Sequence, residues 1–478
     1  MSDQHPAPGA PPTTGTPSPG TSTSGYPTSG YPTPGYPTPA RRAPLPRAAW
    51  ALGAGGLALG LVVGGCSGVV GGALVASTGG PLVGGLLSAA GERSVADALP
   101  DELPRLRAFV AEERGLDWEQ EVPVRALDDR AFEAALSGDG AGGEASSDGG
   151  GAEDEWPVGL DDPADGRAET YAALGLTPSA ATYREAWESG DSAVVGFYDS
   201  DTREVVLRGT GWTPVVEETL VHELVHALDD QHVDLDAPLE EDPSPEEVTA
   251  HAAVVEGDAE RVAWAWFDGL DDEQLDAYDE AWEQSWDEED GRGAADVAFD
   301  PLADALVQFP YEYGYVAVEA VDGDRGPAAV TALLEDPLTT TEQVLAARPE
   351  PSSSPGLAAA ADVVAPAAPE GAQVLGTGGL GLFPLSLLPL VDEAEDEGYW
   401  LEDDVVTFAW AGDAWTTWVD PQDEDRACTT VLVRLDDARG RDDLADDLQD
   451  WVASAGDVGA SLAPVGETDL ELHGCGDR

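Results

Sequence analysis

Residues 213–228 have the sequence TPVVEETLVHELVHAL. Thr213 is a good N-cap, and Pro214 suits the first position of a helix. Apolar side chains then recur at helical spacing: Val215, Val216, Leu220, Leu224, Val225 and Leu228. The segment therefore predicts an amphipathic helix that continues through His222 and His226.

Within this helix, His222, Glu223 and His226 form a candidate metal site. Residues four apart lie on the same face of a helix, so both imidazoles can bind one ion. Glu223 lies about a hundred degrees further round, where it can reach an attacking water without binding the ion. This is the HExxH motif of zinc-dependent peptidases, the zincins. It predicts a Zn2+ ion with Glu223 as general base; the alternative is a surface helix with two solvated histidines.

Zinc in a hydrolytic site needs a third protein ligand and one open position. His232 stands ten residues after His222, but it reaches the ion only if the helix breaks sharply at Asp229, where glycine would be easier. Glu256 needs no such break, because it lies on a second predicted helix that begins with a capping box at residues 244–247. We therefore expect Glu256, rather than His232, to complete the site.

Further side chains are expected to support this site. Glu260 lies one turn after Glu256 and can orient a ligating histidine, with Asp229 and Asp258 as alternatives. A donor to the developing oxyanion can come from one of three tyrosines, although core packing is the commoner fate of such residues. They are Tyr311, Tyr313 and Tyr315.

Over about residues 100–478, the chain resembles a family of bacterial zinc metallopeptidases of the gluzincin kind. The matching segments are HELVHALDDQH at 222–232, VEGDA at 255–259, FPYEYG at 309–314 and PLTTTEQVL at 337–345. The family pattern usually continues with His-Pro, whereas this chain has Ala346-Ala347. The resemblance implies zinc on His222, His226 and Glu256 with Glu223 as base, and it implies no particular substrate.

The N-terminal part differs in composition from the rest of the chain. Residues 1–47 are rich in Pro, Gly, Ser and Thr and contain a Gly-Tyr-Pro-Thr repeat, so we expect a disordered tail. Residues 48–75 lie in an uncharged stretch long enough to cross a bilayer as one helix. Arginines precede this stretch and acidic residues follow it, which predicts a cytoplasmic tail and an external C-terminal part.

Two details of the anchor 48–75 concern its partners. Glycines recur every fourth residue from Gly56 to Gly72, and such a smooth ridge would allow a homodimer through the helix. The segment 61–66 loosely resembles a bacterial lipobox, so lipidation of Cys66 is the alternative to an uncleaved anchor.

The order of expected elements predicts an α+β fold. A helix, a strand, two short helices, a hairpin and the two ligand helices suit a zincin-like catalytic domain over residues 92–345, with a flexible insertion at 138–152. Residues 346–387 are expected to be a linker or long loop, and 388–478 a smaller C-terminal α+β lobe. Within that lobe, we expect Trp-rich strands and one helix over about residues 441–453.

The charge balance limits the partners. The 478 residues include 22 basic and 94 acidic side chains, a formal net charge of -72, and every basic one is Arg. Such an excess excludes nucleic acid and anionic lipid surfaces as partners, because both need basic residues. Cys428 and Cys475 are expected to form a disulfide if this part of the chain is external.

Together these patterns predict a single-pass protein of the cell membrane whose extracellular domain hydrolyses peptide or protein substrates. Strand 204–208 could accept an extended peptide as an added strand. Two alternatives remain at this stage: a non-catalytic cell-surface binding module with a residual zinc site, and a zinc amidase acting on cell-wall crosslinks.

Overall fold

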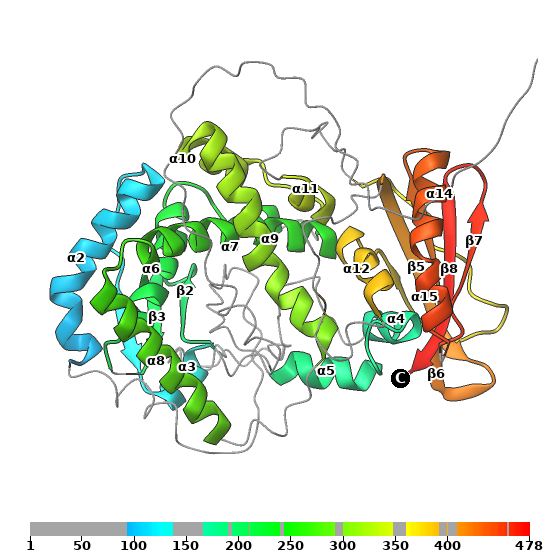
Figure 1. Cartoon of the computed structure of the whole chain (residues 1–478), viewed down its shortest axis with the longest axis horizontal. Coiled ribbons are helices and arrows are strands. Elements are labelled where there is room, and N and C mark those ends of the chain that lie inside the picture. Colours follow the sequence, from blue (N-terminus) through cyan, green and yellow to red (C-terminus); the bar gives the residue numbers. More distant parts are fainter. Residues whose placement is uncertain are drawn as a thin grey trace, which may run out of the picture. The chain divides into compact units, whose positions relative to one another are not determined.

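The structure is a computed structural model (Figure 1). It describes residues 93–136, 166–189, 194–209, 211–239, 243–291, 300–347, 360–391, 399, 409–456 and 458–478. The expected tail 1–47, the anchor 48–75 and the insertion 138–152 lie outside these residues. No helix in the described stretches is long and apolar enough to cross a bilayer. The fold is mixed α+β, as expected at that level.

The first sheet has three strands in the order β1-β3-β2. The expected hairpin is confirmed by β2 (Gly196–Asp199) and β3 (Glu204–Arg208), while β1 (Val124–Leu127) pairs with β3 in parallel. The prediction that strand 204–208 can accept a peptide is wrong, because β3 is bonded to a neighbour on each side and has no free edge. In the described part of this sheet, the edges are β1 and β2.

Two helices of this part of the chain pack directly on this sheet, and the others pack on neighbouring helices. Their bounds are α2 (Val95–Arg114), α3 (Asp129–Leu136), α6 (Pro214–Asp229), α7 (Pro245–Phe267), α8 (Asp272–Gly291), α9 (Pro301–Arg325), α10 (Pro327–Glu335) and α11 (Thr341–Ala346). The α6 start is as expected, since the Thr213 hydroxyl accepts a hydrogen bond from the Val216 amide. Its apolar face, including Leu220 and Leu224, is buried against the sheet and α2.

The helices α7 and α9 cross with their backbones in contact. The expected capping box at the start of α7 is formed by Ser244 and Glu247. At the crossing, a Cβ on Gly257 would lie 2.2 Å from the carbonyl carbon of Gly314, and one on Gly314 would lie 2.1 Å from the Ala253 oxygen. Only glycine allows the two backbones to approach this closely.

The second sheet has five antiparallel strands in the order β4-β5-β6-β8-β7. Their bounds are β4 (Val374–Gly378), β5 (Trp410–Asp420), β6 (Asp423–Leu435), β7 (Ser461–Val465) and β8 (Asp469–Asp477). Cys428 on β6 faces Cys475 on β8, and the two form the expected disulfide.

Two helices pack directly on this second sheet, and three more contribute to the same apolar core. They are α4 (Arg167–Leu174), α5 (Ala180–Ser189), α12 (Leu382–Leu387), α14 (Ala438–Asp447) and α15 (Gln449–Ser454). The α4 backbone lies directly on β8: a Cβ on Gly474 would come within 2.1 Å of the Ala173 oxygen, and one on Gly476 within 2.0 Å of the Ala172 oxygen. The second sheet is thus completed by a helix from the expected catalytic segment.

Two expectations about the C-terminal part need correction. The single helix expected over 441–453 is divided at Leu448, because the buried Trp451 turns toward α4 and donates a hydrogen bond to the Leu174 carbonyl. The second half of the expected linker 346–387 carries β4 and α12, since the apolar residues of α12 are buried. One apolar core joins α4, α9, α12 and β5, so the packing is continuous across residue 387.

Candidate metal centre

Three buried side chains converge where α6 and α7 meet. His222 and His226 come from α6 and Glu256 from α7, and one nitrogen or oxygen atom of each lies within 4.8 Å of the others. Glu256 Oε2 is 3.1 Å from His222 Nε2 and 3.5 Å from His226 Nε2. The structure therefore brings together the three residues expected to bind zinc.

The packing of α7 explains why Glu256 points toward the histidines. The next residue, Gly257, contacts the α9 backbone at Gly314, which fixes how α7 is rotated about its own axis. Consecutive helical residues differ by about a hundred degrees, so Glu256 is turned away from α9 and toward α6. The glycine contact and the ligand position are thus parts of the same packing arrangement.

Glu223 is fully buried beside the histidines. Neither of its carboxylate oxygens makes a well-formed hydrogen bond to a described residue. Burial raises the pKa of Glu223 to about 7, against the opposing effect of His222 and His226 and a weak interaction with the Tyr198 backbone. A carboxylate with a pKa near neutrality is suited to accept and return a proton.

The charges of the site are coupled. Burial by itself would lower the pKa of His222, but Glu256 and Glu260 raise it to about 10. Burial would likewise raise the pKa of Glu256, but His226 and His222 hold it below its usual range. The carboxylates thus favour positive charge at this place, and a bound proton satisfies that preference when no metal is present.

The donor atoms also fit a cation chemically. The ring nitrogens of His226 are buried and have no ordinary hydrogen-bond partner among the described residues. Buried polar atoms of this kind are rare, because leaving them unpaired costs about 1–3 kcal/mol each. Two imidazoles and one carboxylate are a donor set used by hydrolytic zinc sites.

Of the expected supporting residues, Glu260 is the one in place. Its Oε1 lies 3.4 Å from His222 Nδ1, where it can orient the ring. The alternatives, Asp229 and Asp258, instead form ion pairs with Arg114.

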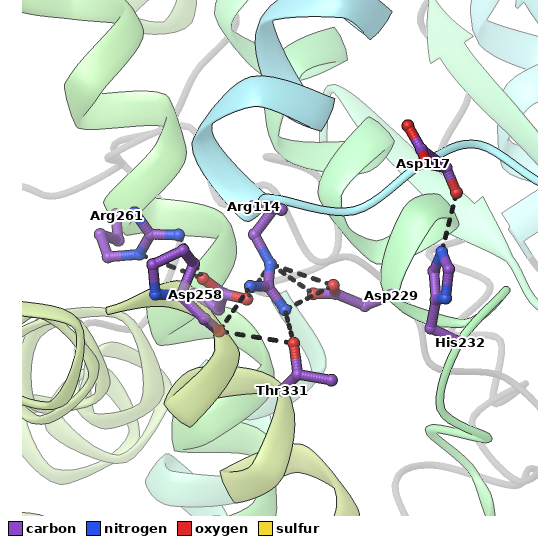
Figure 2. A network of polar contacts seen from close by, with 8 residues as sticks. Arg114, Asp117, Asp229, His232, Asp258, Arg261 and Thr331 are labelled. Atoms are coloured by element: carbon purple, nitrogen blue, oxygen red, sulfur yellow. Dashed lines mark hydrogen bonds and ion pairs between the residues drawn. The ribbon is translucent and has the colours of Figure 1, made fainter. Parts of the chain in front are cut away.

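His232, the rival third ligand, points away from the site. Its Nε2 lies 2.9 Å from the carbonyl oxygen of Asp117, in the segment that follows α2 (Figure 2). The sharp break that a His232 ligand requires at Asp229 is absent, since Asp229 is still part of α6 and has no positive φ. This geometry agrees with the preference for Glu256.

The three candidate tyrosines have different surroundings. The Tyr311 ring stacks on His222 with 6.3 Å between centroids. Tyr313 packs against Phe309 and Phe383 in the core, and Tyr315 lies against Trp264. Tyr311 is therefore the tyrosine of this trio that lies beside the ligands.

One partly buried pair near the site was not expected from the sequence. The Tyr278 hydroxyl of α8 donates a 2.5 Å hydrogen bond to Glu218, which lies one turn before His222. Burial raises the pKa of Glu218 to about 7. The spacing of four between Glu218 and His222 was a usable signal, because it places both on one helix face.

Comparison with known protein families, with curated proteins and with solved structures found no match.

Proposed function

We propose that this chain is a zinc-dependent peptidase of the gluzincin type, with a zincin-like catalytic domain. The observation that carries the proposal is the meeting of His222, His226 and Glu256 beside the buried carboxylate of Glu223. Two helices supply these groups, and both helices also carry residues of the apolar cores.

The chain's own residues divide the chemistry among them. His222, His226 and Glu256 would hold one Zn2+ ion, which when bound polarises a carbonyl and makes water more acidic. Glu223 takes the proton of the attacking water and passes it to the leaving amine. The Tyr311 hydroxyl is the proposed donor to the carbonyl oxygen as it becomes negative, and Glu260 holds the ring of His222 in position.

The substrate in this proposal is an extended peptide or protein segment. Its backbone can add to a free strand edge, which among the described residues means β1 or β2. Of these two edge strands, β2 lies against the metal helix: a Cβ on Gly196 would come within 2.7 Å of the Thr219 methyl group. The strand that we propose to pair with the substrate is therefore β2 rather than β3.

The cellular setting remains part of the proposal. A membrane anchor at 48–75, which could also support a homodimer, would hold the catalytic part outside the cell. The disulfide between Cys428 and Cys475 supports an oxidising compartment.

Metal analysis of the purified full-length chain tests the proposal. After dialysis against metal-free buffer, the wild type and His232→Ala should retain about one zinc per chain, whereas His222→Ala, His226→Ala and Glu256→Ala should not. Loss of zinc in His232→Ala with retention in Glu256→Ala would replace the gluzincin assignment by a metzincin-like one.

A substrate comparison separates the remaining alternatives. A zinc-loaded wild type that cleaves casein supports the peptidase. Cleavage of cell-wall crosslinks alone would support an amidase, and no cleavage of either would support a binding module.

A further inference from the structure

Arg114, the last residue of α2, is completely buried and lies between two carboxylates (Figure 2). Its Nη2 is 2.7 Å from Asp229 Oδ1, and its Nε is 2.6 Å from Asp258 Oδ2. Both aspartates are buried as well. A single guanidinium therefore joins two side chains that come from different helices.

These two helices are the ones that supply the metal ligands. Asp229 follows His226 by three residues at the end of α6, and Asp258 follows Glu256 by two residues in the middle of α7. Arg114 is thus hydrogen-bonded to α6 through Asp229 and ion-paired to α7 through Asp258, within about one turn of a ligand on each helix.

The network continues to α9 and α10. Arg261 pairs with Asp258 at 3.0 Å and with Asp322 of α9 at 3.6 Å. From the other side, Arg114 donates to the Pro327 carbonyl and the Thr331 hydroxyl of α10, each at 3.4 Å. The position of Arg114 is therefore determined from several directions.

The end of α6 is also attached directly to the segment after Arg114. The Gln231 side-chain oxygen accepts hydrogen bonds from the amides of Glu119 and Gln120, and His232 contacts the Asp117 carbonyl. The DDQH sequence at 229–232 supplies no metal ligand in this proposal. Its contacts instead hold the segment that follows α2 against the end of α6.

We infer that Arg114 is the positioning residue of the metal centre and sets the separation between the histidine pair and Glu256. A buried ion network is poor as a source of stability, because desolvation offsets most of the attraction. The planar guanidinium of Arg114, however, holds its donors in fixed directions, which a lysine ammonium on a flexible stem cannot do. The consequence for zinc rests on the proposed function, whereas the effect on the two helices does not.

The test compares Arg114→Lys with a matched control, Arg167→Lys, in the full-length chain. Arg167 is also buried, packs over Trp415 and donates to the Gly379 carbonyl, far from the metal ligands in sequence. Three measurements are made: zinc affinity by chelator competition, the visible spectrum of the Co2+-loaded protein, and hydrogen exchange of residues 222–232 and 250–258 without metal.

We expect Arg114→Lys to weaken zinc binding about 10- to 100-fold, the usual range for residues that orient ligands, and to change the Co2+ spectrum. Without metal, exchange should rise in both segments. Arg167→Lys should leave the affinity and the spectrum unchanged even if it lowers the melting temperature. Should Arg114→Lys fail to fold, Asp229→Asn, which keeps the side-chain shape, takes its place with the same expectations.

Affinity within twofold of the wild type together with unchanged exchange would overturn the inference. So would equal losses of affinity in the control, since the effect would then be general destabilisation. A wild type that binds no zinc overturns the proposed function alone. In that case the exchange comparison decides about Arg114: faster exchange than in Arg167→Lys supports the positioning role, and equal exchange refutes it.

Discussion

Glu223 is the residue on which the proposed chemistry depends most directly. Replacement by Gln preserves the size of the side chain and removes its basic oxygen. We expect Glu223→Gln to keep zinc and to lose about two to four orders of magnitude in peptide hydrolysis. Initial rates on a fluorogenic peptide, with zinc content measured on the same sample, check this. Activity within tenfold of the wild type would show that another group is the base.

Glu312 is expected to make the stability of the fold depend on pH. Burial, and then the nearby Asp304, raise its pKa from 4.5 to about 7. Between these two pKa values the folded state therefore binds more protons than the unfolded state. The contribution of Glu312 to the free energy of unfolding is fully present below the unfolded pKa and is lost as pH rises through the folded pKa of about 7.

Glu312→Gln removes this titration. At pH 8 we expect the variant to be more stable than the wild type by roughly 1–3 kcal/mol, with little difference at pH 4. Urea unfolding at both pH values measures the change. An equal difference at the two values would mean that the ionised form of Glu312 carries no penalty in the folded state.

At this scale, the sequence predicted the cluster of candidate ligands and the nearby Glu260, but not Arg114. Their spacing on one helix was enough to find His222, Glu223 and His226. Glu256 was preferred to His232 because it lies on a capped second helix and needs no sharp break of the first one. Arg114 could not be found in this way, because its contact with Asp229 joins residues 115 positions apart. Long-range ion pairs depend on how helices dock, and local sequence does not contain that information.

Among the elements, the crossing of α7 and α9 is the most constrained. A methyl group at Gly257 of α7 would overlap the α9 backbone. One at Gly323, which belongs to α9 itself, would meet nothing within 4 Å. Gly257→Ala should therefore lower the free energy of unfolding by on the order of 3 kcal/mol and weaken zinc binding. Gly323→Ala should be neutral or slightly stabilising, because alanine favours a helix.

Urea unfolding and zinc titration of the two glycine variants check this prediction. Equal stability of Gly257→Ala and the wild type would mean that the helices can separate at the crossing without loss.

Element boundaries were predictable where local chemistry sets them. Thr213 and the capping box of Ser244 mark the starts of α6 and α7 because their side chains bond to nearby amides. The pairing of β1 with β3 and the break at Leu448 were not predictable, since the first joins distant segments of the chain and the second involves a contact between Trp451 and Leu174.

For the whole molecule, the net charge of -72 is the dominant electrostatic property. Repulsion among so many carboxylates opposes the compact state, and salt screens it. We expect the melting temperature to rise by roughly 5–10 °C between about 0.05 and 1 M sodium chloride, measured at constant pH. A melting temperature that falls or stays constant would show that ion pairs, which salt weakens, outweigh the repulsion.

Helix α4 is synthesised long before β8, the strand on which it packs. All its residues are buried in the finished structure, and its backbone lies on β8. Strand β8 is made about 300 residues after α4, an interval of about 15–60 s at roughly 5–20 residues per second. A nascent chain therefore passes through a stage in which α6 and α7 have been made while the surface of α4 that packs on β8 is still exposed. During that stage the exposed apolar surface of α4 can bind other unfolded chains, which favours aggregation.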